Sequence, residues 1–501
     1  MKATNTLFAR LLMIAKSSRE IDLQDVISNY EFTAINSTLM KTDGSLITSD
    51  SKSDLIHVLE SLATEKESNS ENNTDSHLNT FVVVDGMSVV HEVMSAISPK
   101  TCKDVGDAVT KTIESRCKSY EGCRVIFDNY VRRNSIKDII RRRKLGVQSA
   151  GTAYIVVDTT PIKDPKQFMA NNETKDSLTV YLADKVLQLK YPVVTVTRQH
   201  VRSNMDDIQP STGVSTQEEA DTLIILHAAE IFAAGKNVHI MTQDTDVLVL
   251  ALQRLTVLGP QTTMLMGTGD KRRKVSLKPI YDRLGTSKAA ALPGFHCITG
   301  CDTCGHIRGI GKKTAFKAFI KATAEELTAL TQLGAEEMPS ANVASGCERF
   351  LCRLFSTKRD LQANTAGKLR WKCFTSQPGG IDKIPPTSGA WYQHILRAHM
   401  QAYIWNQALV ENPNIPDPFK LGWSCDADNI PIPVLSEMAI APESVVELVR
   451  CGCGISKCSR RCSCRRHNLT CTESCACGAD EECANTAVQQ TEELDNSDDG
   501  N

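Results

Sequence analysis

Short apolar runs that end in an acidic residue recur through the middle of the chain. They read FVVVD, RVIFD, VHIMTQDTD and FHCITGCD, and the acids at or near their ends are Asp85, Asp128, Asp244, Asp246 and Asp302. Continuous apolar runs of this length are typical of buried parallel strands. Helical patterns at 174–190 and 217–234 alternate with them between residue 79 and about residue 320, in the order expected of βαβ units. We therefore predict an α/β fold whose mainly parallel, twisted sheet is flanked by helices.

Changes in composition divide the rest of the chain. Residues 1–60 carry no pattern that assigns an element, whereas 64–78 are rich in Ser, Asn and Glu, as linkers are. Helix-compatible segments follow the α/β region, the most amphipathic of them at 391–410, and IPIPVL after them has an extended pattern. The predicted domains are an N-terminal region with its linker (1–78), the α/β domain (79–324), a mostly helical region (325–445), a small cysteine-rich module (446–485) and a disordered acidic tail (486–501).

The acids in these runs can meet at one edge of the predicted sheet. In open α/β sheets, ligands bind beyond the carboxyl ends of the strands. The segment QEEAD adds Glu219 and Asp221 to the set. Carboxylates gathered in one cleft repel each other unless cations neutralise them, and hard oxygen ligands suit Mg²⁺ or Mn²⁺. The sequence therefore predicts a site for a pair of divalent ions.

A simpler interpretation exists for each acid alone. A single Asp after a strand is most often a helix cap or a turn residue. The run YIVVD ends at Asp158 in the same way and belongs to no acidic pair. The spacing of the other acids favours a site, because one residue separates Asp244 from Asp246 and likewise Glu219 from Asp221. Where the chain is extended, such a pair points both carboxylates to one side.

Composition narrows the class of protein. The chain has 501 residues, of which 41% are hydrophobic and 23% charged, as in ordinary globular proteins. Its net charge of -2 means that any nucleic-acid surface must be a local patch. No stretch approaches the roughly 18 apolar residues of a membrane span, and LFARLLMIA is too short for a signal peptide. Nineteen cysteines without such a signal indicate reduced thiols and metal ligation in an intracellular protein.

These motifs resemble those of the PIN-like nuclease superfamily, most closely its flap endonuclease branch, from residue 81 to about residue 320. VVVDGMSVVHE and VIFDNY look like the family's first two metal-binding segments, QEEADTLIILHA like its acid-Ala-acid motif and QDTDVLVL like its Asp-x-Asp. GCDTCGHIRGIGKKTAFKAF is similar to its last acid followed by a helix–hairpin–helix. The resemblance implies a PIN-like fold and a two-metal site in which the catalytic residues, all ligands of Mg²⁺ or Mn²⁺, are Asp85, Asp128, Glu219, Asp221, Asp244, Asp246 and Asp302.

The family-like arrangement would place the first four acids around one ion and the last three around the other. The residues that precede Asp85 have no counterpart at the usual start of the family, and the region 130–215 shows no clear match to its substrate-threading helices. The resemblance therefore does not imply specificity for five-prime flaps.

Basic residues near these motifs are candidates for phosphate binding. The first group follows VIFDNY and consists of Lys137, Arg141, Arg142, Arg143 and Lys144; a solvated basic helix face is the alternative. The second group is the turn HIRGIGKKTA, where Gly309 and Gly311 permit a tight turn and the next helix start offers free N–H groups. Lys312 and Lys313 add charge there. A turn that only packs two helices together is the alternative for this second group.

The cysteine-rich module carries nine cysteines at positions 451, 453, 458, 462, 464, 471, 475, 477 and 483. Three tetrahedral zinc ions need twelve ligand positions, which nine thiolates supply if three of them bridge two ions each. The ligands would be Cys451, Cys453, Cys458, Cys462, Cys464, Cys471, Cys475, Cys477 and Cys483. A disulfide knot is the alternative. The gap before Cys483 is longer than usual for the family that this spacing resembles, the tesmin/TSO1-like proteins with their DNA-binding CXC domain.

That second resemblance implies a DNA-contacting face. Its basic residues would be Lys457, Arg460, Arg461, Arg465 and Arg466. Arg461 stands where some members of the family have a Tyr that enters the minor groove, and Arg also inserts into narrow A·T-rich minor grooves.

Together these features predict an intracellular, nuclear, metal-dependent nuclease that acts on DNA and is tethered to it by a zinc CXC module, without a membrane partner. A second interpretation is a non-enzymatic DNA-binding protein that retains the nuclease fold as a scaffold, since fold alone does not establish activity. A third is an RNA-cleaving PIN-like enzyme. The complete set of acids favours an enzyme over a scaffold, and the CXC module favours DNA over RNA.

Overall fold

The structure is a computed structural model with two compact units. It describes residues 2–15, 21–48, 53–63, 79–130, 136–137, 139–140, 152–206, 208–356, 363–376, 384–427, 429–446, 451–454, 458–467, 469–471, 475–478 and 483–485. The α/β unit comprises residues 46–350 and 394–433, and the terminal unit comprises 1–45, 351–393 and 434–501. The predicted linker at 64–78 and the predicted tail at 486–501 lie outside the described residues.

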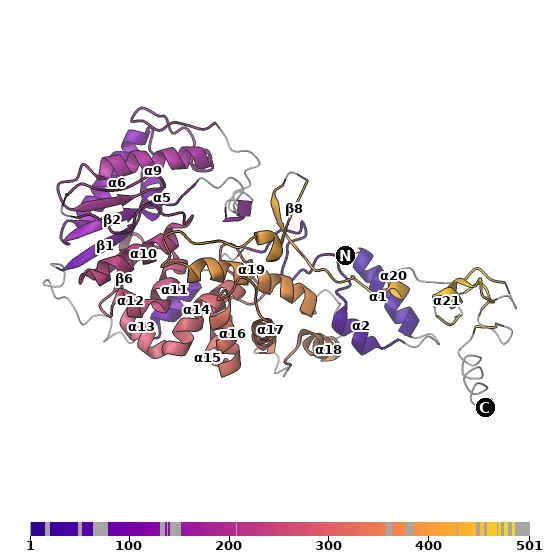
Figure 1. Ribbon diagram of the computed structural model, residues 1–501. Coiled ribbons are helices and arrows are strands. Elements are labelled where there is room, and N and C mark those ends of the chain that lie inside the picture. Colours follow the sequence, from indigo (N-terminus) through magenta and orange to yellow (C-terminus); the bar gives the residue numbers. More distant parts are fainter. Residues whose placement is uncertain are drawn as a thin grey trace. The chain divides into compact units, whose positions relative to one another are not determined.

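A seven-stranded sheet forms the centre of the α/β unit (Figure 1). Its strands are β1 (Thr80–Asp85), β2 (Gly122–Ile126), β3 (Val193–Val196), β4 (Val201–Ser203), β5 (Asn237–Met241), β6 (Thr263–Met266) and β7 (Arg273–Ser276). Their order across the sheet is β4-β3-β2-β1-β5-β6-β7. The four inner pairs are parallel, and only β3–β4 and β6–β7 at the two edges are antiparallel. The predicted α/β class with a mainly parallel sheet is confirmed.

Helices cover both faces of this sheet (Figure 1). One face carries α5 (Gly86–Ala96), α6 (Cys102–Cys117) and α9 (Asn172–Val186), and the other carries α10 (Ala220–Ala233), α11 (Thr245–Gln253) and α12 (Leu255–Leu258). Residues of β2 alternate between the faces as the strand period requires. Cys123 and Val125 join the apolar core under α5, α6 and α9, whereas Arg124 is buried and pairs with Glu230 of α10 at 3.0 Å.

The strand order reverses between β1 and β5. From β1 the chain builds outward through β2 to β3 on one side, and later through β5 to β6 on the other. In a doubly wound sheet, such a reversal leaves a crevice at the carboxyl ends of the two central strands, and ligands bind there. The chain leaves β1 at Asp85 and leaves β5 three residues before Asp244, so both acids lie at this crevice.

The first residue of α5 illustrates how tightly the crevice is built. Gly86 follows Asp85 directly, and a Cβ atom on it would lie 2.5 Å from the Phe127 ring and 3.0 Å from the carbonyl oxygen of Ile126. Only glycine allows the ends of β1 and β2 to approach this closely. A larger residue would displace the two strand ends that carry Asp85 and Asp128.

The remainder of the α/β unit is mostly helical. It contains α3 (Asp54–Glu60), α8 (Pro165–Phe168), α13 (Leu277–Leu284), α14 (Thr286–Ile298), α15 (Lys312–Ile320) and α16 (Ala324–Gln332), the hairpin of β8 (Trp423–Cys425) and β9 (Pro431–Pro433), and parts of α17 (Ala341–Ser356) and α19 (Ser388–Asn406). The run FHCITG, predicted as a strand, lies at the end of α14 instead. A short apolar run does not distinguish a strand from the last turns of a buried helix, and here the run continues a helical segment.

The terminal unit has a small helical core of its own. Its complete helices are α1 (Lys2–Ala15), α2 (Leu23–Asn29), α18 (Ala366–Ser376), α20 (Glu443–Val446) and α21 (Ser463–Arg466). Arg370 of α18 is 1% exposed and donates hydrogen bonds to the carbonyl oxygens of Ile27, Tyr30 and Pro385, which ties α18 to α2. Among the described residues, no helix is both long enough and apolar enough to cross a membrane.

Candidate active site and cysteine cluster

Asp85 and Asp128 follow neighbouring parallel strands. Asp85 is the last residue of β1, and its Oδ1 accepts a hydrogen bond from the Ser88 N–H at 2.9 Å, which caps α5. Its Oδ2 accepts one from Thr242 Oγ1, also at 2.9 Å. Asp128 lies two residues beyond β2 and accepts from the Ala220 N–H at 2.8 Å. Asp85 is therefore a helix cap and also a member of an acidic cluster.

The two acidic pairs lie at helix N-termini. Glu219 is the N-cap of α10 and Asp221 lies in its first turn; Asp244 caps α11 and Asp246 lies in that first turn. Only the first acid of each pair has an extended backbone, so the expectation of two extended pairs is wrong. The helix starts inside each pair, where the unpaired N–H groups and the helix dipole favour negative charge.

One open cleft of about 1050 Å³ collects most of the acids. Its lining includes Asp85, Asp128, Lys137, Asp221, Asp244 and the exposed Asp302. Ligand oxygens of Asp221, Asp244 and Asp246 lie within 4.8 Å of one another. Two oxygens on opposite sides of a Mg²⁺ ion lie about 4.2 Å apart, so this trio has nearly the spacing of a metal site. The family-like arrangement assigns Asp221 to one ion and Asp244 and Asp246 to the other, whereas here the three lie together.

Lys137 lies against the acids at the start of α10. Its Nζ is 3.4 Å from Glu219 Oε1 and 3.3 Å from Asp221 Oδ2. Glu219 itself lines a neighbouring cavity rather than the open cleft, so Lys137 and Glu219 mark the boundary between the two. Arg141, Arg142, Arg143 and Lys144, the other predicted members of this basic group, lie outside the described residues.

Burial and mutual repulsion make the acids hard to ionise together. Burial, together with the charges of Asp128 and Asp244, raises the pKa of Asp85 to about 7. Burial also raises the pKa of Asp221 well above its usual range, and the Lys137 ammonium offsets only part of that rise. A bound cation would oppose these rises in pKa, because it favours the charged form of every neighbouring carboxylate.

Asp246 is linked to a buried lysine through a histidine. His296 Nε2 lies 2.8 Å from Asp246 Oδ1, and Lys312 Nζ lies 2.8 Å from His296 Nδ1. The ammonium has no lone pair, so Nδ1 must accept its hydrogen bond and Nε2–H must donate to Asp246. The other hydrogens of Lys312 point to the His296 carbonyl oxygen at 3.0 Å and to Thr299 Oγ1 at 2.8 Å. This Asp246–His296–Lys312 chain holds the carboxylate in a single orientation.

The hydrogen bonds of Lys312 contradict one prediction from the sequence. Lys312 was expected to add positive charge to the phosphate-facing turn, but it is 0% exposed and its three donors are engaged in the interior. Lys313 is exposed and pairs with Asp54 at 3.3 Å. Gly309, with φ of +77°, and Gly311, the N-cap of α15, form the predicted turn. Phosphate binding by this turn stays a prediction.

The cysteine cluster of the terminal unit has the dimensions of a zinc site. Eight of its nine cysteines are buried, and Cys453 is half-buried. Neighbouring Sγ atoms lie 3.6 to 3.8 Å apart. Two thiolates on one tetrahedral zinc are about 3.8 Å apart when each Zn–S bond is 2.3 Å. Cys451 belongs to all three groups of four cysteines that could hold an ion, as expected of a bridging ligand, and Cys483 lies 3.7 Å from Cys477.

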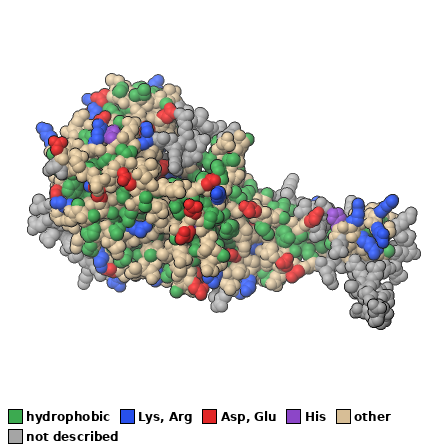
Figure 2. Space-filling view, viewed as in Figure 1, with side chains coloured by type: hydrophobic (Ala, Val, Ile, Leu, Met, Phe, Trp, Pro, Cys, Tyr) green, Lys and Arg blue, Asp and Glu red, His purple; other side chains and the backbone are tan. Residues whose placement is uncertain are grey.

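Exposed arginines surround this cluster. Arg460, Arg461, Arg465 and Arg466 are all exposed, and Figure 2 shows blue side chains gathered over this part of the chain. Arg465 also reaches the carbonyl oxygen of Ala484 at 3.5 Å. Lys457 lies outside the described residues. The local positive charge contrasts with the chain's net charge of -2.

Sequence reasoning missed His296 and Thr242, which orient Asp246 and Asp85. Neither residue stands in an acidic motif. His296 precedes Asp302 by six residues within the same apolar run, so its position was a signal, but its partner Lys312 could be recognised only after α14 and α15 had been placed together.

Comparisons with known proteins give little guidance. No protein-family model and no curated protein matches the chain. Among solved structures, the chain is similar to one described as the crystal structure of T5 D15 protein co-crystallised with metal ions, at 14% sequence identity and a TM-score of 0.32. The match covers 66% of this chain and 97% of that one.

Proposed function

We propose that this chain is a divalent-metal-dependent nuclease of PIN-like fold that hydrolyses phosphodiester bonds in DNA. The proposal is carried by the convergence of four carboxylates, those of Asp85, Asp128, Asp221 and Asp244, in one cleft at the strand reversal. They come from four separate elements and point to one space. Their repulsion is relieved either by protonation or by positive charge, and at about 4 Å each like-charge pair costs about 4 kcal/mol in surroundings of intermediate polarity.

The residues present fit a pair of hard cations. The acids that line the cleft offer carboxylate oxygens, the donor type that Mg²⁺ and Mn²⁺ prefer. Asp221, Asp244 and Asp246 would hold one ion, and Asp85 and Asp128 a second, with Glu219 and Asp302 at the margins. When bound, such ions neutralise charge on a phosphate and lower the pKa of a bound water.

Other side chains of the site would position the reacting groups. Lys137 Nζ lies within 3.4 Å of an oxygen of each of two carboxylates, and its ammonium can move to a phosphate oxygen of a bound strand. Thr242 and the Ser88 N–H fix both oxygens of Asp85, and His296 fixes one oxygen of Asp246. Preorganised ligands of this kind lose little entropy when metal and substrate bind.

The direct test is cleavage of labelled single-stranded, flap and duplex DNA, with RNA as a further arm, in Mg²⁺ or Mn²⁺. We expect EDTA to abolish cleavage and Asp244→Asn to reduce kcat about a thousandfold while the protein stays folded. Asp158→Asn is the matched control, because Asp158 also follows an apolar run but pairs with Tyr181 and Lys185 away from the cleft. Full turnover in Asp244→Asn would contradict the site, and preference for RNA would redirect the proposal to a ribonuclease.

The same proposal assigns the cysteine cluster as a DNA-binding CXC module with three zinc ions, which suits a nuclear protein. It is supported by the 3.6 to 3.8 Å spacing of the thiol sulfurs, by the sharing of Cys451 and by the exposed arginines around the cluster. The segment has almost no other apolar residues to bury, so metal ligation would supply its folding free energy, about 10 kcal/mol or more for each structural zinc.

A further inference from the structure

We propose that the cavity beside the acidic cleft binds one unpaired nucleobase of the DNA strand that the carboxylates cleave. This inference rests on the proposed function and deepens it, because it names the substrate as a strand with at least one unpaired nucleotide. The cavity has a volume of about 310 Å³, at the lower end of the range of small-molecule sites and suited to a single planar ring system.

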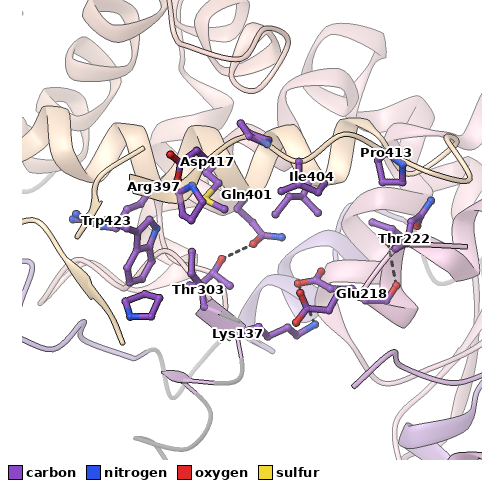
Figure 3. A pocket seen from close by; sticks show the side chains of 18 of the residues that line it. Lys137, Glu218, Thr222, Thr303, Arg397, Gln401, Ile404, Pro413, Asp417 and Trp423 are labelled. Atoms are coloured by element: carbon purple, nitrogen blue, oxygen red, sulfur yellow. Dashed lines mark hydrogen bonds and ion pairs between the residues drawn. The ribbon is translucent and has the colours of Figure 1, made fainter. Parts of the chain in front are cut away.

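The cavity wall is mostly apolar. Trp423 of β8, Pro413 and Ile404 of α19 line it (Figure 3), and so do Pro416 and Pro431. An indole ring and proline rings offer faces on which any base can stack, whatever its sequence identity. Stacking of this kind contributes about 1 to 3 kcal/mol for each base.

A hydrogen-bond donor and a hydrogen-bond acceptor both belong to residues that line the cavity. Thr303 donates a hydrogen bond to Gln401 Oε1 at 2.6 Å, which fixes the amide so that its NH₂ group is the end left for a ligand (Figure 3). Gln217, only 5% exposed, donates from Nε2 to the carbonyl oxygens of Ala408 at 3.3 Å and Val410 at 2.6 Å. Those two acceptors fix its orientation, and its Oε1 is a buried acceptor without a hydrogen-bond donor among the described residues. A donor and an acceptor together match the edge of a nucleobase.

The position of the cavity identifies the rest of the ligand. Lys137 lines both the cavity and the acidic cleft. Glu219 lines the cavity and Asp221, two residues later, lines the cleft, so the Cα atoms of these two lining residues are at most about 7 Å apart. A backbone phosphate at Lys137 and the carboxylates would therefore bring a base of the same or the next nucleotide to the cavity. A paired base could not enter, because stacking inside the cavity requires the base to leave the duplex.

The test fills the cavity without touching a carboxylate. Ile404→Trp places an indole ring on the cavity wall, Ile404→Phe is a milder filler, and Tyr403→Trp places the same indole at the neighbouring, half-buried position that does not line the cavity. Dissociation constants of the full chain are measured by fluorescence anisotropy with a labelled single-stranded DNA, in Ca²⁺ to occupy hard-oxygen sites. The same strand is prepared with a tetrahydrofuran abasic unit at each position in turn.

For the wild type we expect base loss at one position to weaken binding about tenfold and at the other positions less than twofold. Ile404→Trp should bind the intact strand about tenfold more weakly and no longer respond to that position, with Ile404→Phe intermediate and Tyr403→Trp like the wild type. Wild-type affinity of both filled variants, or equal effects of base loss at every position, would overturn the pocket. Parallel cleavage assays in Mg²⁺ separate the two proposals: binding with this pattern but without hydrolysis by the wild type would defeat the nuclease proposal alone.

Discussion

At the scale of single residues, Lys312 balances a negative charge in the interior of the α/β unit. Asp246 is 3% exposed and its charge is compensated through His296, whose ring also stacks on Trp405 at 5.8 Å between centroids. An ammonium buried with three acceptors in place is stable only while its counter-charge remains. Each member of the chain therefore depends on the other two.

We predict that Lys312→Met lowers the free energy of unfolding by about 3 to 5 kcal/mol, because it leaves the Asp246 carboxylate buried without compensation. Urea unfolding monitored by circular dichroism measures the change. Lys313→Met is the matched control at the exposed neighbouring position and should stay within about 1 kcal/mol of the wild type. Asp246→Asn added to Lys312→Met should recover part of the loss, and strictly additive effects would show that the two residues are not coupled.

We expect Asp85 to make cation binding in the cleft depend on pH. Its pKa is raised from 3.8 to about 7, so the folded state holds its proton more tightly than the unfolded state. That contribution to stability is complete below about pH 4 and is lost as the pH rises through about 7. We expect the Tm of the metal-free protein to fall over this interval, and Mg²⁺ to raise Tm more at pH 8 than at pH 5.

Thermal unfolding at both pH values, with Mg²⁺ or EDTA, measures this dependence. Asp85→Asn should reduce both the pH dependence and the Mg²⁺ effect, whereas Asp158→Asn should leave both unchanged. An Mg²⁺ effect of equal size at pH 5 and pH 8 would contradict the role of Asp85.

At the scale of elements, the acids of the site lie partly at strand ends and partly at helix N-termini. β1 and β2 deliver Asp85 and Asp128, and the N-termini of α10 and α11 deliver the two acidic pairs. The cysteine segment has no comparable framework, since α21 is its sole helix among the described residues and spans only Ser463–Arg466. Metal ions would have to provide what strands and helices provide in the α/β unit.

We predict that the full chain carries about three zinc ions by elemental analysis and that the cysteines contribute unequally. Cys451→Ser should lower the zinc content by more than one ion, because Cys451 belongs to all three candidate groups. Cys453→Ser should lower it by one ion at most, because the half-buried Cys453 belongs to one group. Cys425→Ser, at an exposed cysteine of the α/β unit, is the control and should change nothing. Equal losses in the first two variants would argue against a bridging role for Cys451.

At the scale of the whole molecule, two clusters of potential metal ligands lie in different compact units. The carboxylates lie in the α/β unit, and the cysteines lie in the terminal unit. If the terminal unit tethers DNA and the α/β unit cuts it, changes in the first should alter affinity but leave the chemical step intact.

We predict that Arg461→Ala with Arg465→Ala weakens DNA binding and lowers the slope of log Kd against log salt by about 1.8, the loss of two phosphate contacts. The value of kcat at saturating DNA should stay within twofold of the wild type. Lys190→Ala, at an exposed lysine of the α/β unit, is the control for a generic loss of charge. An unchanged salt slope in the double variant would remove these arginines from the DNA-binding face.

The sequence by itself determined the α/β class, the central strands β1, β2 and β5, the helices α9 and α10, and the identity of the clustered acids. Apolar runs, the 3.6-residue helical period and an acid at a strand end are local properties, and parallel strands bring their carboxyl ends to a common edge. Asp85, Asp128, Asp221 and Asp244 were therefore predictable as neighbours. The cysteine spacing likewise predicted a compact thiol cluster, because ligands close in sequence can surround common ions.

Only the tertiary structure decided which charges face the cleft and which are buried. Lys312 and Lys313 are adjacent in sequence, yet the first is neutralised inside the α/β unit by Asp246 through His296, and the second lies at the surface. The cavity beside the cleft depends on α19 and the β8–β9 hairpin, which begin 86 and 121 residues after Asp302. Burial and contact between distant segments arise from packing, which no local pattern specifies.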